Sequence, residues 1–215
     1  MISKRLLETI EFIKGFNCLA DCGTDHGYLP IYAVENGLVS RAYASDNKKY
    51  PLENARRNIE SEYLEDKIEL VLSNGLSYLN KDIDLVTILG LGGRSIAKII
   101  SEANMKYVKR IILSPNSEQA ILREYLENNN WNIIAESFVK DKGKYYQIIV
   151  CEPGKMKLNK LEREFGPYII KQKSPEFIEF VESLIDTLKE AIKKVKNQSE
   201  ANKLIKRINE LKEVI

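Results

Sequence analysis

The residues best suited to chemistry stand between positions 19 and 28, where the chain reads LADCGTDHGY. Two carboxylates, Asp21 and Asp25, alternate there with the glycines at positions 23 and 27. Glycines let a backbone turn closely enough for a ligand to lie against it, as in nucleotide-binding loops. The pattern is not GxGxxG, however, and an acid at position 25 would repel a pyrophosphate. The loop therefore favours a cationic ligand such as the sulfonium of S-adenosylmethionine over a dinucleotide.

Within this loop Asp21 is the candidate for holding the methionine ammonium of the cofactor, directly or through water. Gly23, Thr24 and His26 would line the same site. The same residues could also form no more than a tight turn between a strand and a helix. The interpretation therefore depends on the segments that follow.

Three later segments end in polar or glycine-rich turns that would meet the loop at the carboxyl edge of a parallel sheet. Asp46 follows the second expected strand, where a carboxylate can hold a ribose diol. Asn74 follows the third and can offer its amide to an adenine edge, although an Asx turn would explain it equally well. The glycine-rich turn Gly90-Leu91-Gly92-Gly93 follows the fourth. The full predicted cofactor set is Asp21, Gly23, Thr24, His26, Asp46, Asn47, Asn74, Gly75, Gly90 and Gly92.

Apolar runs alternate with helical patterns and predict the elements that carry these residues. Strands are expected over residues 17–22, 41–46, 68–72, 84–90 and 110–114, and a terminal hairpin over 131–137 and 145–151. Helices are expected over residues 1–13, 29–36, 52–59, from 94, and over 118–128. Such a succession predicts an α/β fold: a Rossmann-like seven-stranded methyltransferase sheet, parallel except for an antiparallel strand added by the hairpin.

The pattern breaks at Glu152-Pro153-Gly154, which divides the chain into a catalytic domain over 1–154 and an extension over 155–215. Apolar residues then recur at steps of four and three over 177–195 and again over 201–215, with the polar stretch 196–200 between them. We expect an antiparallel, coiled-coil-like helical hairpin, with joints at 166–167 and 174–175. The extension holds 14 Lys and Arg against 10 Asp and Glu, which suits either a solvated helical surface or contact with nucleic acid.

Composition limits the remaining classes. The odd count of three cysteines suits a reducing cytoplasm without disulfides, and a single histidine gives no metal-ligand spacing. No apolar run approaches the roughly 18–20 residues that span a bilayer, and the N-terminus does not resemble a signal peptide. We expect a cytoplasmic monomer with no membrane segment and no metal.

The segment Asp21-Cys22-Gly23-Thr24-Asp25-His26-Gly27-Tyr28-Leu29-Pro30 resembles the motif D-x-G-x-D-H-A-Y-L-P of the bacterial tRNA (adenine-22-N1)-methyltransferase family. Residues 51–55, 74–76, 90–93 and 113–116 extend the resemblance over essentially the whole chain. Gly27, Leu91 and Ser114 depart from the family pattern, but none of these changes removes an ionisable group.

The resemblance implies transfer of a methyl group from S-adenosylmethionine to N1 of adenine 22 in tRNA. N1 carries a lone pair, so positioning supplies much of the rate, and positive charge then develops on the adenine. Asp25 is the candidate catalytic carboxylate, accepting from the exocyclic N6 amine, and the resemblance supports that role. Asn116 could accept from N6 through its amide oxygen, or a helix N-cap at Asn116 or Ser117 could account for it without chemistry.

Other residues could contact the substrate. His26 could orient Asp25, contact tRNA, or be only a structural hydrogen-bonder. Tyr28 could stack a base or pack beneath the loop, and Pro115 could stiffen the platform under the adenine. Cations of the extension could bind tRNA phosphates. The predicted substrate residues are Tyr28, Pro115, Arg94, Lys193 and Arg207, with Lys189, Lys196, Lys203 and Lys206 beside the last two.

Three alternatives stay open at this point. A methyltransferase acting on a small molecule or a protein would keep the loop but would not need the basic extension. A noncatalytic RNA-binding protein could retain a degenerate methyltransferase fold. A dinucleotide oxidoreductase fits less well, because the loop lacks the third glycine.

Overall fold

The computed structural model describes residues 3–215, and Met1 and Ile2, with which the first predicted helix was to begin, lie outside the described residues. Seven strands form one sheet in the order β3-β2-β1-β4-β5-β7-β6. β7 is antiparallel to β5 and β6, and the other pairs are parallel. The predicted seven-stranded α/β fold is therefore confirmed. The strands are β1 (Cys18–Cys22), β2 (Arg41–Asp46), β3 (Ile68–Leu72), β4 (Leu85–Leu89), β5 (Arg110–Ser114), β6 (Trp131–Asp141) and β7 (Lys144–Pro153).

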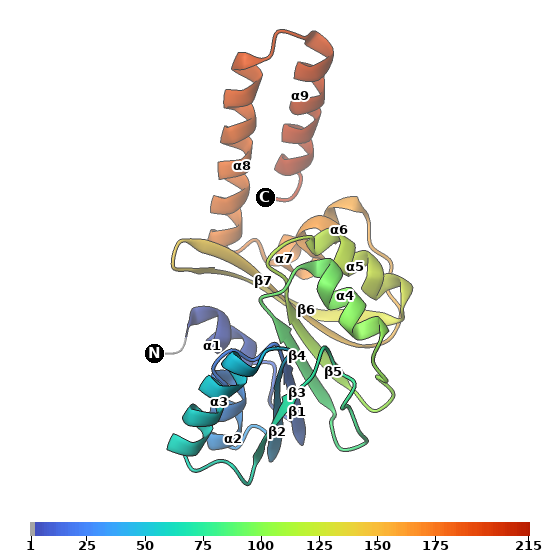
Figure 1. Cartoon of the computed structure of the whole chain (residues 1–215). Coiled ribbons are helices and arrows are strands. Elements are labelled where there is room, and N and C mark those ends of the chain that lie inside the picture. The colour runs from blue at the N-terminus through green and yellow to red at the C-terminus, as the bar shows by residue number, and fades with distance from the viewer. Residues whose placement is uncertain (1–2) are drawn as a thin grey trace.

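Helices cover both faces of the sheet (Figure 1). Leu19 of β1 packs with the helices of one face, whereas Cys18, Ala20 and Cys22 point into the core on the other, as period-two alternation requires. All five residues of β1 are buried, because a parallel strand is covered on both sides. One face carries α1 (Lys4–Ile10), α2 (Tyr28–Glu35) and α3 (Lys49–Ser61), and the other α4 (Gly93–Ser101) and α5 (Gln119–Asn128).

The β6–β7 hairpin is longer than the sequence predicted. Only Lys142 and Gly143 form its turn, and both have positive φ, 48° and 77°. Such a turn matches the right-handed twist of the flanking strands, so both strands continue almost to its tip. Because β7 pairs antiparallel with β5, the tip extends beyond the carboxyl ends of the parallel strands.

The extension forms four helices, and the last two make the predicted antiparallel hairpin (Figure 1). Phe177 of the third of these packs edge-on against Phe138 of β6, which anchors the extension to the sheet. Asn197 caps the backbone amides of Ser199 and Glu200, so the last helix begins inside the polar stretch predicted to separate the pair. The helices are α6 (Lys160–Phe165), α7 (Pro167–Gln172), α8 (Pro175–Lys194) and α9 (Gln198–Lys212).

A buried ion pair, which the sequence did not indicate, joins the extension to the sheet. Arg123 of α5 and Glu136 of β6 are 2.7 Å apart with both side chains fully buried. Arg123 also donates to the carbonyl oxygens of Arg163 and Glu164, while Glu136 accepts from the Tyr168 amide. Because the two buried charges complete their hydrogen bonds with backbone groups of α6 and α7, they fix where these helices dock.

Within residues 3–215 no helix is long and apolar enough to cross a membrane, and no three His, Cys, Asp or Glu side chains gather as metal ligands. All three cysteines are free and buried. Burial raises the pKa of the Cys22 thiol to about 12 and that of the Cys18 thiol to about 11, so both stay protonated at neutral pH.

Candidate active site at the carboxyl edge of the sheet

Two cavities lie on either side of Gly23, which lines both of them. The first is about 190 Å³, and its lining comes from the loop after β1, from α1 and from β4. The second is about 80 Å³ and lies between the ends of β1, β2 and β3 and helix α4. The structure thus brings together most of the predicted cofactor residues, namely Asp21, Gly23, Thr24 and His26 in the first cavity and Gly23, Asp46, Asn47, Asn74 and Gly75 in the second.

Gly90 and Gly92 lie beside the cavities rather than in their lining. Gly90 has a positive φ of 83° and approaches the Arg5 guanidinium, and Gly92 is the N-cap of α4. A side chain at Gly93 would overlap the backbone of Glu118, so the β4 and β5 loops pack directly against each other. These glycines shape the crevice by letting backbones approach.

Asp21 is a buried carboxylate with an incomplete set of partners. The residue is 6% exposed, and Thr87 Oγ1 donates to its Oδ1 at 2.6 Å. Burial raises the pKa of the Asp21 carboxyl above its ordinary value, although the Thr87 and Thr24 hydroxyls and the Arg5 guanidinium partly oppose that rise. A cation arriving in the cavity would stabilise the ionised form of this group.

The loop that follows Asp21 is held on two sides. The amides of Gly23 and Thr24 donate to the Ser45 carbonyl oxygen of β2 at 2.8 and 2.9 Å. On the other side, Asn58 Nδ2 of α3 donates to the His26 carbonyl oxygen at 2.8 Å. Gly27 has a φ of 69°, and a Cβ there would lie 3.3 Å from the Cβ of Ala55. The glycine that departs from the family motif therefore suits both the backbone and the close packing.

Asp25 lines the first cavity but is largely open to solvent. Its side chain is 72% exposed, and its Oδ2 is 3.3 Å from Nε2 of His26. The His26 ring stacks on Tyr28 with centroids 5.2 Å apart and planes inclined by 21°. Tyr28 is 53% exposed, so it does not pack beneath the loop. Asp25, His26 and Tyr28 form a connected polar and aromatic surface along one wall of the first cavity.

In the second cavity Asp46 has one carboxylate oxygen that accepts no hydrogen bond from residues 3–215. Its Oδ1 accepts from the Lys48 amide at 2.8 Å, which leaves Oδ2 for a ligand. Asn74 is exposed, and its side chain makes no hydrogen bond to any residue within 3–215. The Asx turn considered as an alternative is therefore absent, and the amide is available to a ligand.

Asn116 is held to the β4 loop. Its Nδ2 donates to the Gly90 carbonyl oxygen at 2.6 Å, and its backbone amide donates to the Leu91 carbonyl oxygen at 2.8 Å. The N-cap of α5 is Glu118, in the left-handed region with φ 58°, so the N-cap alternative at Asn116 or Ser117 is wrong. With Nδ2 engaged, Oδ1 is the atom that Asn116 can offer to an amine.

The predicted substrate residues are scattered more widely. Pro115 is buried at the end of β5. Arg94 donates from Nε to Glu118 Oε1 at 2.6 Å. Lys193 pairs with Glu190 at 2.5 Å, and Arg207 pairs with Glu210 at 3.1 Å and with Glu164. The structure does not bring Lys193 and Arg207 to either cavity, because both belong to the extension helices.

Arg5 of α1 is a site residue that the sequence did not reveal. It lines the first cavity together with Asp21 and Asp25, and its guanidinium lies 4.8 Å from the centroid of the Tyr146 ring. Nothing in the local pattern marks it, because an arginine on an amphipathic helix is ordinary. Only the docking of α1 over the sheet places it there.

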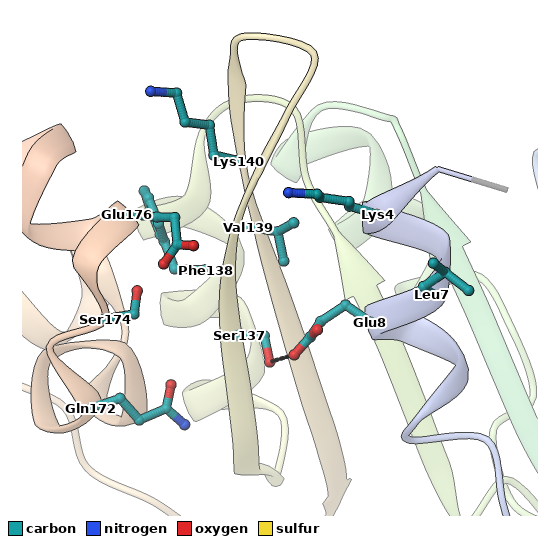
Figure 2. Close-up of a pocket in the computed structure, with 10 residues that line it drawn as sticks. All are labelled: Lys4, Leu7, Glu8, Ser137, Phe138, Val139, Lys140, Gln172, Ser174 and Glu176. Carbon is teal, nitrogen blue, oxygen red and sulfur yellow. Dashed lines mark hydrogen bonds between the residues drawn. The ribbon is translucent and has the colours of Figure 1, made fainter. Parts of the chain in front are cut away.

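A larger groove of about 440 Å³ lies between α1 and the start of α8, with β6 as its floor (Figure 2). At its base Ser137 Oγ donates to Glu8 Oε1 at 2.8 Å. Lys4 points across it from one wall, and Ser174 and Glu176 stand on the other (Figure 2). None of the predicted site residues lines this groove, so it is separate from the two cavities.

The sheet order, together with a cavity pair at the carboxyl edge lined by acidic and glycine residues, defines a Rossmann-like methyltransferase that uses S-adenosylmethionine. Within that class, the chain belongs to the tRNA (adenine(22)-N(1))-methyltransferase family, TrmK, whose model matches residues 19–215.

Proteins that are similar to this chain in sequence and in structure carry names of the same family. The tRNA (adenine(22)-N(1))-methyltransferase of Bacillus subtilis is 31% identical over 233 residues, covering 100% of this chain and 97% of its own length. Streptococcus pneumoniae Sp1610 in complex with S-adenosyl-L-methionine has a TM-score of 0.91 at 37% identity, covering 100% of this chain and 99% of its own. M. capricolum TrmK in complex with S-adenosyl-homocysteine has a TM-score of 0.86 at 34% identity, with 99% and 96% covered.

Proposed function

We propose that this protein transfers the methyl group of S-adenosylmethionine to N1 of adenine 22 in tRNA. The observation that supports this most strongly is the meeting of two cavities at Gly23, with Asp21 and the largely exposed Asp25 in one and Asp46 in the other. The matching family model and the B. subtilis relative both carry the name of this reaction.

The side chains of the two cavities fit the cofactor. Asp21 is a buried carboxylate that would pair with the methionine ammonium, and Arg5 would pair with the methionine carboxylate. Oδ2 of Asp46 would accept from a ribose hydroxyl, and Asn74 would offer its amide to the adenine edge. Bound S-adenosylmethionine supplies an electrophilic methyl group on a sulfonium. Thr24, His26, Asn47 and Gly75 would complete the walls, and Gly90 and Gly92 the adjoining backbone turns.

The residues beside the first cavity would position and stabilise the target base. Asp25 would accept a hydrogen bond from N6 as positive charge develops on the adenine, and His26 would hold that carboxylate in place. Oδ1 of Asn116 would be a second acceptor for N6, and Pro115 would stiffen the end of β5 beneath the adenine. Tyr28 would stack on a base. Since N1 lies on the Watson–Crick edge, the adenine must be unpaired before it reacts.

The rest of the tRNA would contact the extension, residues 155–215, which we treat as a unit distinct from the catalytic domain, 1–154. Lys196, Lys203 and Lys206 have no carboxylate partner within residues 3–215 and would reach phosphates directly. Lys193 and Arg207 would have to exchange a carboxylate for a phosphate, and Arg94 would likewise have to leave Glu118. We further propose that the protein acts as a monomer in the cytoplasm.

The test is methylation of unmodified tRNA transcripts with radiolabelled S-adenosylmethionine. One transcript carries adenine at position 22, and its matched control carries guanine there. We expect label in the first transcript only. If neither transcript takes up label while the cofactor still binds, the assignment of tRNA as the substrate is wrong. A methyltransferase for another substrate or a noncatalytic RNA-binding protein then becomes the better account.

A further inference from the structure

The start of α3 carries two lysines and a tyrosine that project into solvent. Lys48, Lys49 and Tyr50 are all exposed, and Tyr50 is 78% exposed. Neither lysine has a carboxylate within ion-pair distance anywhere in residues 3–215. By contrast, the two arginines further along the same helix, Arg56 and Arg57, both lie within 4.0 Å of Glu53. We call Lys48, Lys49 and Tyr50 the α3 ridge.

These residues do not serve the stability of α3. Positive charges at the N-terminus of a helix oppose its dipole, and the first turn of α3 holds no acidic residue to compensate. Lys48 is the N-cap but makes no capping hydrogen bond with its side chain. A tyrosine that is 78% exposed buries little apolar area in the free protein. The composition of the ridge therefore points to a partner outside the chain.

The ridge overhangs the active site. α3 meets the loop after β1 at Ala55, beside Gly27, and at Asn58, which donates to the His26 carbonyl oxygen. At about 1.5 Å of rise per residue, Lys49 stands about 9 Å beyond Ala55 along the helix axis. α2 begins at Tyr28, at the level of the loop itself. The first turn of α3 thus rises past the surface that carries Asp25 and Tyr28.

We propose that the α3 ridge binds the tRNA strand beside the target adenine, with Lys48 and Lys49 on phosphates and Tyr50 stacked on an unpaired base. This rests on the proposed function. Cations combined with an exposed aromatic ring are the pairing that holds single-stranded nucleic acid without reading its sequence. An adenine taken out of its pairing leaves neighbouring nucleotides unstacked, and the ridge offers them a surface.

The chain provides a matched control at the other end of the same helix. Tyr63 is 86% exposed, directly after α3, but its neighbours are acidic: Glu60, Glu62, Glu65 and Asp66. A helix that starts at the carboxyl edge of the sheet ends at the opposite edge, so Tyr63 lies away from both cavities. An exposed tyrosine alone should contribute nothing to RNA binding there.

The experiment compares the full-length wild type with Tyr50→Ala, the double variant Lys48→Ala/Lys49→Ala, and Tyr63→Ala. Affinity for fluorescently labelled tRNA is measured by anisotropy at several salt concentrations, cofactor affinity by calorimetry, and methylation in parallel. We expect Tyr50→Ala to weaken tRNA binding roughly 5-fold or more, as loss of one stacked base does. The double variant should lower the slope of log affinity against log salt by about 1.4–1.8, since two phosphate contacts are lost.

Cofactor affinity should be unchanged in all variants, and Tyr63→Ala should behave as wild type. If Tyr50→Ala and the double variant keep the wild-type tRNA affinity and salt slope, the proposal that the α3 ridge binds tRNA is overturned. The proposed function would still stand in that case if those proteins methylate adenine 22. If wild type binds tRNA but methylates nothing, the proposed function fails while the binding data still decide on the ridge. If wild type does not bind tRNA, both are overturned.

Discussion

Replacing Asp21 with asparagine should weaken cofactor binding and at the same time stabilise the free protein. Asp21 is 6% exposed, and burial raises the pKa of its carboxyl, so keeping this group ionised in the folded protein costs free energy. Asparagine keeps an oxygen that can accept from Thr87, which donates to Asp21 Oδ1 at 2.6 Å in the wild type. The substitution therefore removes the charge without leaving the Thr87 hydroxyl unpaired.

The size of the binding loss follows from the contact that disappears. A hydrogen bond to a charged group contributes about 1.5–3 kcal/mol, so Kd for S-adenosylmethionine should rise roughly 10- to 150-fold. Each kcal/mol of desolvation that the free protein no longer bears should raise Tm by about 2–4 °C for a chain of this size. Calorimetric titration gives the first quantity, and a thermal melt without cofactor gives the second.

The same substitution should remove a pH dependence. Because the folded-state pKa of Asp21 is raised, the carboxyl is protonated below that pKa and cannot pair with an ammonium. Wild-type affinity for the cofactor should therefore strengthen as pH rises through the raised pKa. The favourable contribution of this group to stability is present at low pH and is lost over the same rise. Asp21→Asn should show neither change. An unchanged Kd, or a lower Tm in the free variant, would refute the role given to this carboxylate.

Three further substitutions separate chemistry, cofactor binding and architecture. Asp25→Asn should lower kcat by about 100-fold or more while leaving cofactor affinity unchanged, because Asp25 lines the first cavity with a largely exposed side chain that is assigned to the adenine and not to the cofactor; equal loss of both in calorimetry and kinetics would contradict this. Arg5→Gln should raise Kd for S-adenosylmethionine roughly 10-fold, read by calorimetry, since a charged pair becomes a neutral contact; an unchanged Kd would exclude Arg5 from the cofactor site. Arg123→Met should destabilise the protein by about 3–5 kcal/mol in denaturant unfolding, because Glu136 would be left buried and unpaired. A loss below about 1 kcal/mol would show that water reaches that pair.

Much of the fold was predictable because its signals are local. Each parallel strand is a short apolar run, and polar residues directly after a strand must come to the same edge of a parallel sheet. That rule brought Asp21, Asp46 and Asn74 together without knowledge of the tertiary structure, and the two cavities at Gly23 agree with it. The antiparallel tail hairpin was likewise visible in the heptad-like spacing of its apolar residues.

Features that depend on tertiary contacts were missed. Arg5 enters the first cavity only because α1 docks over the sheet, and an arginine on an amphipathic helix gives no local signal. Arg123 and Glu136 carry no local signal of burial, because arginine and glutamate side chains are usually exposed, yet both are fully buried. The helix N-cap considered as an alternative at Asn116 or Ser117 lies instead at Glu118, whose backbone packs against Gly93 in a contact between two loops.

The most direct test of the account is the identity of the methylated nucleoside. Wild-type protein is incubated with an unmodified tRNA transcript carrying adenine 22 and with S-adenosylmethionine, and the product is digested to nucleosides for mass spectrometry and mapped by reverse transcription. The account predicts 1-methyladenosine and a reverse-transcription stop at position 22. Methylation at N6 or on a ribose, or 1-methyladenosine at another position, would contradict it.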